Sequence, residues 1–219
     1  MGLFFLAGVV TAGAVWINFT ALKKGKLSVI QPIMGLEVPL VVLIGYFFLA
    51  EQLSMVQYAA IALITISLIM VAYTKRTEKF TVENGVLWGV VGAVGIALMD
   101  VFKGGLSQLT HPLFALWAIN AVWFVISLFI LASQGALNNL FSGFKRHPKI
   151  VVWQSVLDNI AWIAFGFAVL YAPISIVLAI SENFILLSVL LGVFVNKERL
   201  VWWQVIGIVL AMIGILLLV

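Results

Sequence analysis

The chain alternates between long apolar stretches and short polar connections, and this pattern predicts a bundle of membrane-spanning helices. A helix of about 20 apolar residues crosses the hydrocarbon core of a bilayer. Eight stretches are long and apolar enough: roughly residues 2–22, 27–50, 55–73, 85–108, 112–133, 150–171, 173–195 and 200–219. The longer connections are a polar linker at 75–84 and the segment 136–149, which we expect to begin at the membrane interface. The expected fold is therefore an all-α integral membrane protein with eight transmembrane helices.

A second pattern is an internal repeat, because residues 21–66 recur in register 147 positions later. In so apolar a chain, matches between apolar residues are expected by chance, whereas matches between polar residues or glycines are informative. The informative matches pair Ser28 with Ser175, Gly45 with Gly192, Glu51 with Glu198 and Gln57 with Gln204. A weak repeat in an apolar chain is typical of a membrane protein built from two related halves, with a transport site between them.

The repeat matches the last three expected helices to the first three and leaves residues 85–133 without a counterpart. The first half therefore lacks about sixty residues, enough for two helices. We expect a 3+5 remnant of two inverted five-helix repeats, because halves with an odd helix count must face opposite ways. Its parts are a first half-repeat over 1–74 with two helices missing upstream, a linker over 75–84 and a second repeat over 85–219. A truncation, a misplaced start codon or a true short variant would each give this pattern.

Composition and charge agree with a membrane protein. The chain is 64% hydrophobic and 9% charged, whereas soluble domains are about 25% charged. Eleven of the 12 basic residues lie in loops on one side of the expected bundle, and the exception is Lys103. The positive-inside rule alone puts these loops in the cytoplasm. Short basic runs between apolar stretches do not indicate a nucleic-acid partner, and the absence of cysteine excludes disulfides and thiolate metal sites.

Four of the eight acidic residues lie inside expected spans, each within about 6 Å of its helix midpoint. One carboxylate near the bilayer centre costs about 2.5–3.5 kcal/mol, so these groups must face a protein interior or a wet cavity. Transporters place their sites at this depth. The candidate substrate- or proton-binding residues are these four acids with the polar residues of the same helices: Glu37, Asp100, Lys103, Asp158, Glu182, Asn18, Asn159 and Asn183.

Some of these residues also have a purely structural interpretation. Asp100 and Lys103 are three apart on one helix face, so a local salt bridge competes evenly with a substrate role. Lys103 could instead neutralise Asp158 or Glu182 across a cavity. Glu37 and Glu182 have no basic neighbour in the sequence, which favours function over a helix–helix clamp.

Other features are better explained by structure than by chemistry. Glu51 and Glu198 each stand at a helix exit, where a cap or a loop salt bridge is the simpler role. Pro39 removes a backbone hydrogen bond close to Glu37 and can kink that helix. Two stripes of small residues predict close helix packing: Gly85, Gly89, Gly92 and Gly95, and Gly207, Ala211 and Gly214. Enzyme motifs are absent, so we expect no catalysis, metal or cofactor.

Several short segments resemble the EamA-type carriers of the drug/metabolite transporter superfamily. In the first half these are Ala21-Leu22-Lys23, Ser28, Pro39, the run Leu-Ala-Glu-Gln-Leu at 49–53, and Gln57. The second copy, from Ala168 to Gln204 with Asn-Lys-Glu-Arg-Leu at 196–200, is similar, although Phe184 or Leu186 stands where a proline is expected. The resemblance covers the chain as the family's helices 3 to 10.

The resemblance implies ten helices in two inverted repeats that work by alternating access, and the export of small metabolites such as amino acids. The cavity-lining helices of the family correspond here to 2–22, 27–50, 85–108, 150–171 and 173–195. The family keeps both termini in the cytoplasm, which conflicts with the charge rule, so the sequence leaves the orientation open.

Together these patterns predict a secondary transporter for a small polar or cationic, amino-acid-like metabolite, multi-pass in a prokaryotic cell membrane. Glu37, Asp158 and Glu182 would form an acidic midplane site, while Asp100 and Lys103 would gate it or recognise a zwitterion. The alternatives are an uncoupled facilitator or channel-like exchanger, and a non-transporting scaffold or fragment. The expected partners are a small-molecule substrate and the bilayer, and a homodimer through 55–73 and 200–219 is compatible with the pattern.

Overall fold

The computed structural model describes residues 1–24, 30, 33–72, 84–137, 141–183 and 201–218, and these residues form helices and no strands. The all-α prediction is therefore confirmed for the described chain. Four helices are long and apolar enough to cross a membrane, and three shorter ones are also apolar, which is consistent with a membrane protein. The helices are α1 (Gly2–Lys24), α3 (Glu37–Phe48), α4 (Met55–Ala72), α5 (Asn84–Leu109), α6 (Pro112–Ser133), α7 (Ser142–Arg146), α8 (Pro148–Ala168), α9 (Ile174–Ser181) and α11 (Trp202–Leu218).

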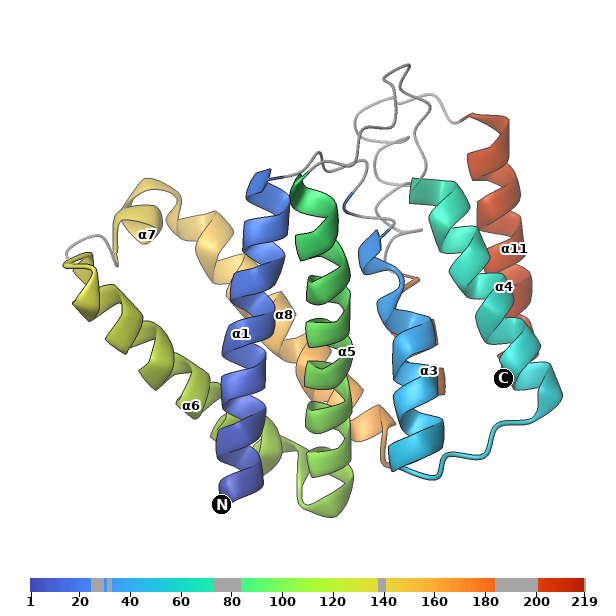
Figure 1. The fold of residues 1–219 in the computed structure, drawn as a ribbon, viewed down its shortest axis with the longest axis horizontal. Helices are drawn as coiled ribbons and strands as arrows, with labels where there is room; N and C mark the ends of the chain where they lie inside the picture. Colours follow the sequence, from blue (N-terminus) through green and yellow to red (C-terminus); the bar gives the residue numbers. More distant parts are fainter. Residues whose placement is uncertain (25–29, 31–32, 73–83, 138–140, 184–200, 219) are drawn as a thin grey trace.

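The helices form one bundle with α1 and α5 side by side at its centre (Figure 1). On one side α6 and α8 diverge from each other towards the end where α7 lies. On the other side α3 packs against α5, and α4 and α11 form a pair at the edge of the bundle.

Small residues set the distance between the two most closely packed helix pairs. A Cβ atom added to Gly95 of α5 would lie 3.2 Å from Ala14 of α1, and one added to Gly207 of α11 would lie 3.0 Å from the Ser67 carbonyl oxygen of α4. At Gly214 the nearest atom of Ile64 would be 2.6 Å away. The close packing predicted from the glycine stripes is confirmed at these positions, while the side-chain surroundings of Gly85 lie outside the described part of the chain.

In two of the expected spans, a described helix begins or ends at a glutamate. In the span expected at 27–50, Gly35 and Leu36 form a turn and a new helix, α3, begins at Glu37. Pro39 has no N–H to donate to the Gly35 carbonyl, which explains a break at this point. In the span expected at 173–195, α9 ends at Ser181 and Glu182 follows as its C-cap, whereas 184–195 lie outside the described residues.

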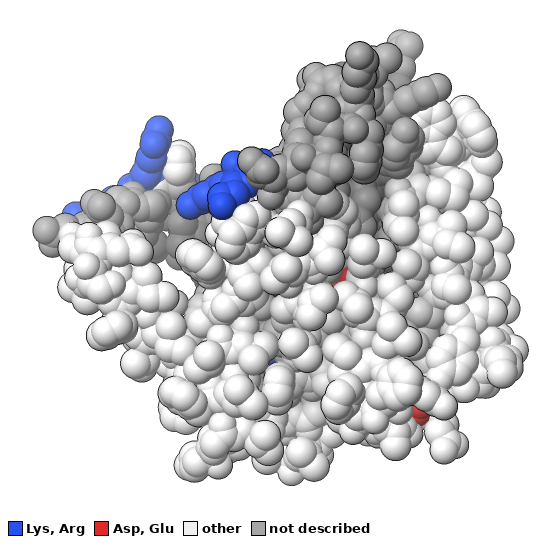
Figure 2. Space-filling model, in the orientation of Figure 1, with Lys and Arg blue, Asp and Glu red and all other residues white. Residues whose placement is uncertain are grey.

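Apart from the buried Lys103, the described basic residues gather at one end of the molecule. Figure 2 shows the Lys and Arg side chains of this face at the end where α1 finishes and α7 lies. Lys23 and Lys24 are in the last turn of α1, and Lys145 and Arg146 are in the last turn of α7. Helix α7 also exposes Phe144, as a segment at the membrane interface would. The opposite end of the bundle carries the loops that have no basic residue.

Candidate functional site

Three of the predicted acidic residues come together from three helices. Glu37 is in the first turn of α3, Asp100 is on α5 and Glu182 caps the end of α9. Glu37 is 7% exposed and Asp100 is 2% exposed, although both carry carboxyl groups. Glu37 shares a side-chain hydrogen bond with Glu182 and also interacts electrostatically with Asp100. We call Glu37, Asp100 and Glu182 the carboxyl cluster.

The Glu37–Glu182 contact has a chemical consequence. A carboxylate can only accept hydrogen bonds, so two carboxyl groups can bond to each other only when one of them carries a proton. Glu37 is at the start of α3 and Glu182 at the end of α9. The pair can therefore form this hydrogen bond only with one proton between its two members.

Lys103 connects the carboxyl cluster to a second group of polar residues. It lies one helix turn from Asp100 on α5, is 5% exposed, and interacts electrostatically with both Asp100 and Asp158. Its Nζ atom lies 3.3 Å from the ring centroid of Trp162 on α8, a cation–π contact. The sequence left open whether Lys103 pairs with Asp100 or with an acidic residue across a cavity, and in the structure it interacts with both Asp100 and Asp158.

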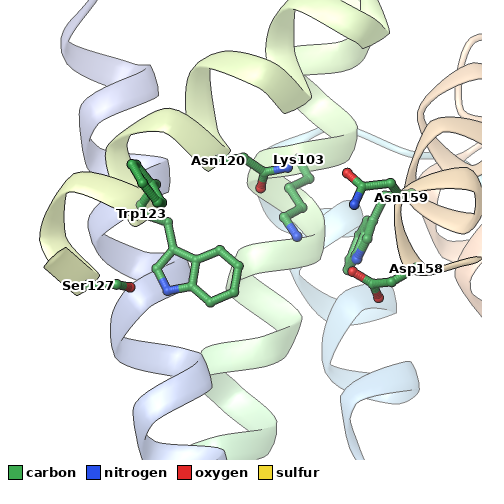
Figure 3. A pocket seen from close by; sticks show the side chains of 8 residues that line it. Lys103, Asn120, Trp123, Ser127, Asp158 and Asn159 are labelled. Atoms are coloured by element: carbon green, nitrogen blue, oxygen red, sulfur yellow. The ribbon is translucent and has the colours of Figure 1, made fainter. Parts of the chain in front are cut away.

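A pocket of about 470 Å³ opens between α5, α6 and α8. In Figure 3 the Lys103 side chain extends between Trp123 of α6 and the polar pair Asp158 and Asn159 of α8. Helices α6 and α8 each contribute both polar and aromatic side chains to the lining, and α5 contributes Lys103. The lining residues are Lys103, Asn120, Trp123, Phe124, Ser127, Asp158, Asn159 and Trp162.

The structure divides the predicted site residues between the cluster and the pocket. Asp158 and Asn159 are exposed and line the pocket, whereas Glu37 and Glu182 do not. Asn183 donates to the Ala179 carbonyl at 2.7 Å, and its Oδ1 is buried with no hydrogen-bond partner among the described residues. Asn18 likewise has a buried, unpartnered Oδ1 and packs against Gly92 of α5. The single acidic site expected from Glu37, Asp158 and Glu182 is thus replaced by two groups that meet at Lys103.

Sequence reasoning missed most of the α6 wall of the pocket. None of Asn120, Trp123 and Ser127 is among the predicted site residues. Their spacing of three and four residues puts all three on one helix face, so a search for polar and aromatic residues on a common face could have found them. Trp162 of α8 also lines the pocket and packs on Phe165.

Comparisons with known proteins support the fold and no activity. No family model matches the chain, and no curated protein is similar to it in sequence. Among solved structures, 26 chains are similar to it. One of them, a crystal structure described only as that of a protein, superposes with a TM-score of 0.69 at 16% identity, over 97% of this chain and 74% of that one. At this identity the likeness shows the fold alone.

Proposed function

We propose that the protein is a secondary transporter that moves a small polar or cationic, amino-acid-like metabolite across a prokaryotic cell membrane by alternating access. The observation that carries the proposal is the carboxyl cluster, which brings the buried Glu37 and Asp100 together with Glu182 in an apolar helical bundle, where α3 begins and α9 ends. Transporter sites are typically built from the ends of interrupted helices near the membrane midplane. The sequence resemblance to EamA-type carriers supports the same function.

The pocket has the chemistry to bind a zwitterion. The Lys103 ammonium can pair with a substrate carboxylate, and the exposed Asp158 carboxylate can pair with a substrate ammonium. Asn120, Asn159 and Ser127 can supply further hydrogen bonds, and the aromatic rings of the lining can contact an apolar side chain. Pockets for small molecules hold roughly 300–1,000 Å³, and the volume of about 470 Å³ falls in this range.

The carboxyl cluster can couple this binding to a proton. Asp100 interacts with Lys103 on one side and with Glu37 and Glu182 on the other. A substrate carboxylate at Lys103 competes with Asp100 for the same positive charge, which favours a proton on the cluster. Substrate and proton would then occupy the site together, and each would promote the binding of the other.

The first prediction tests coupling. With the full-length protein in proteoliposomes, an imposed proton gradient should drive accumulation of the transported amino-acid-like compound, and a protonophore should abolish this accumulation while equilibration continues. Accumulation that is indifferent to the protonophore would favour the alternative, an uncoupled facilitator. If no compound in a panel of this kind were accumulated or equilibrated, the result would contradict transport and favour a non-transporting scaffold.

We also propose that the bundle is a 3+5 remnant of two inverted five-helix repeats, with eight spans, completed by two further helices against α8. The evidence is the comparison of α8 with its repeat counterpart α1. In α1, Ala7, Gly8, Thr11 and Ala14 are buried against α5 and α6. The positions 147 residues later are Gln154, Ser155, Asp158 and Ala161, and all four are exposed. A polar helix face of this kind is costly in lipid, so counterparts of α5 and α6 would cover it.

A comparison of two spin-labelled variants checks this arrangement. Because the chain contains no cysteine, only the introduced cysteine is labelled. A nitroxide on a cysteine at Ser155 should collide rarely with oxygen dissolved in the bilayer when the two helices are present. A nitroxide at Val156 should collide often, because its counterpart Val9 is exposed on α1. The collision rates are measured by power-saturation electron paramagnetic resonance. Equal and high rates at both positions would contradict the proposal that two further helices cover α8.

A further inference from the structure

The polar matches of the repeat form a contact that crosses between the two halves. Glu51 follows α3 in the first half, and its carboxylate accepts hydrogen bonds from the start of α9 in the second half. The Ile174 amide donates at 2.6 Å, the Ser175 hydroxyl at 2.5 Å and the Ser175 amide at 3.4 Å. The first amides of a helix lack internal partners and favour a negative charge. The expected capping role of Glu51 is thus confirmed, but the helix that it caps belongs to the other half.

Gly45 makes this contact sterically feasible. A Cβ atom at position 45 would lie 2.5 Å from Glu51 Oε2 and 2.9 Å from Ser175 Oγ. Ala50 adopts a left-handed conformation with φ of 53°, and the Glu51 amide donates to the Gly45 carbonyl at 3.0 Å. The backbone therefore turns back after α3 and brings Glu51 close to Gly45. Gly45, Glu51 and Ser175 are all positions that the repeat preserves, and one contact explains the three.

The position of this contact suggests a function beyond capping. Helices α3 and α9 pack together, with Gly45 and Ser175 near one end of the contact and Glu37 and Glu182 near the other. Seven or eight helical residues separate the two levels, which is about 10–12 Å. Between them lies an apolar core that includes Val41 and Val177. The contact therefore closes the route from the carboxyl cluster to the membrane face that carries no basic loop.

We propose that Glu51, Gly45 and Ser175 form a latch between the two halves, which holds this face of the transporter closed and must open when the halves rock. The inference rests on the proposed function, because alternating access is what requires the α3–α9 end to open. The latch joins the halves through charge-assisted hydrogen bonds that break and re-form without leaving a charge in lipid, since the loop around Glu51 is exposed at Ala50 and Gln52.

The test uses accessibility, which reports the latch whether or not a substrate is known. Val41 is fully buried one turn from Gly45, so a cysteine at Val41 reports whether water reaches the interior behind the latch. In the full-length protein in membrane vesicles, Glu51→Ala should raise its labelling by a water-soluble maleimide about tenfold or more, as expected for loss of charge-assisted hydrogen bonds. Gly45→Ala should do the same, because it separates Glu51 from Ser175 while retaining both polar groups.

Gln57→Ala is the matched control. Gln57 lies in the first turn of α4, after the loop that carries Glu51, and forms a local capping pair with Ser54, at 2.8 and 3.2 Å, entirely within the first half. This variant should leave the labelling of Val41→Cys within about twofold of the parent, since it breaks one local cap of modest energy. Labelling that stays unchanged in both Glu51→Ala and Gly45→Ala would overturn the latch and leave a static cap. Increased labelling in a protein that transports nothing would uphold the latch and count only against the transport function.

Discussion

Replacing Glu37 by glutamine should lower proton-driven accumulation about ten- to a hundredfold, the range expected when a buried charge-assisted hydrogen bond is lost. Glutamine has nearly the shape of a protonated glutamic acid, but its amide cannot release a proton. The Glu37–Glu182 pair would then be fixed in one state, although the packing around α3 is retained. The measurement is initial uptake in proteoliposomes at a series of imposed pH gradients.

The same exchange at Glu182 should give a similar loss, because the pair holds one proton between its two members. Exchange without net accumulation should survive in both variants, since substrate binding at the pocket does not require the proton to leave. The control is Glu78→Gln in the polar linker 75–84, which should transport like the parent. Unchanged uptake and unchanged pH dependence in both Glu37→Gln and Glu182→Gln would refute the proposed mechanism.

Replacing Lys103 by methionine should destabilise the folded protein by about 3–5 kcal/mol, the usual cost of removing one partner of a buried charge pair. Methionine fills a similar volume, so the cost comes from charge rather than from a cavity. Lys103 is almost completely buried, it interacts electrostatically with Asp100 and Asp158, and its ammonium lies over the Trp162 ring. Without it, the fully buried Asp100 has no compensating positive charge among the described residues around it.

A double variant isolates this electrostatic cause. Asp100→Asn combined with Lys103→Met should recover most of the lost stability, because neither charge then remains unpaired. Lys145→Met on the exposed α7 is the control and should change stability by less than about 0.5 kcal/mol. Chemical unfolding in detergent micelles measures all three. If Lys103→Met alone were as stable as the parent, Lys103 would not be the charge that balances the cluster.

The helices could be predicted from the sequence, because they follow from local patterns of apolar and polar residues. The apolar stretches predicted helices, and the described parts of these stretches are largely helical. Glycines spaced three or four residues apart predicted close packing, which the structure shows at Gly95, Gly207 and Gly214. The burial of Glu37, Asp100 and Lys103 also followed from the sequence, since a charged residue inside an apolar helix has to turn away from lipid.

The sequence did not predict which of the candidate residues lie together. Asp158 has the same depth as Glu37 in the sequence, yet it lines a pocket with α6 residues that the sequence did not single out. Depth along a helix is a one-dimensional quantity, whereas the direction of a side chain depends on how each helix is rotated against its neighbours. Glu51 shows the same limit, because its position at a helix exit predicted a cap but not which helix it caps.

The sequence by itself determined that this chain is helical, that it is built for an apolar solvent, and that it carries charges which must be buried together. These properties follow from composition and spacing, which act within one helix or between a helix and lipid. Only the tertiary structure decided which charges share a site, because Glu37 and Glu182, or Glu51 and Ser175, are more than a hundred residues apart. Their contacts depend on how α3 and the loop after it pack against α9, and the directional hydrogen bonds that join them exist only after that packing has formed.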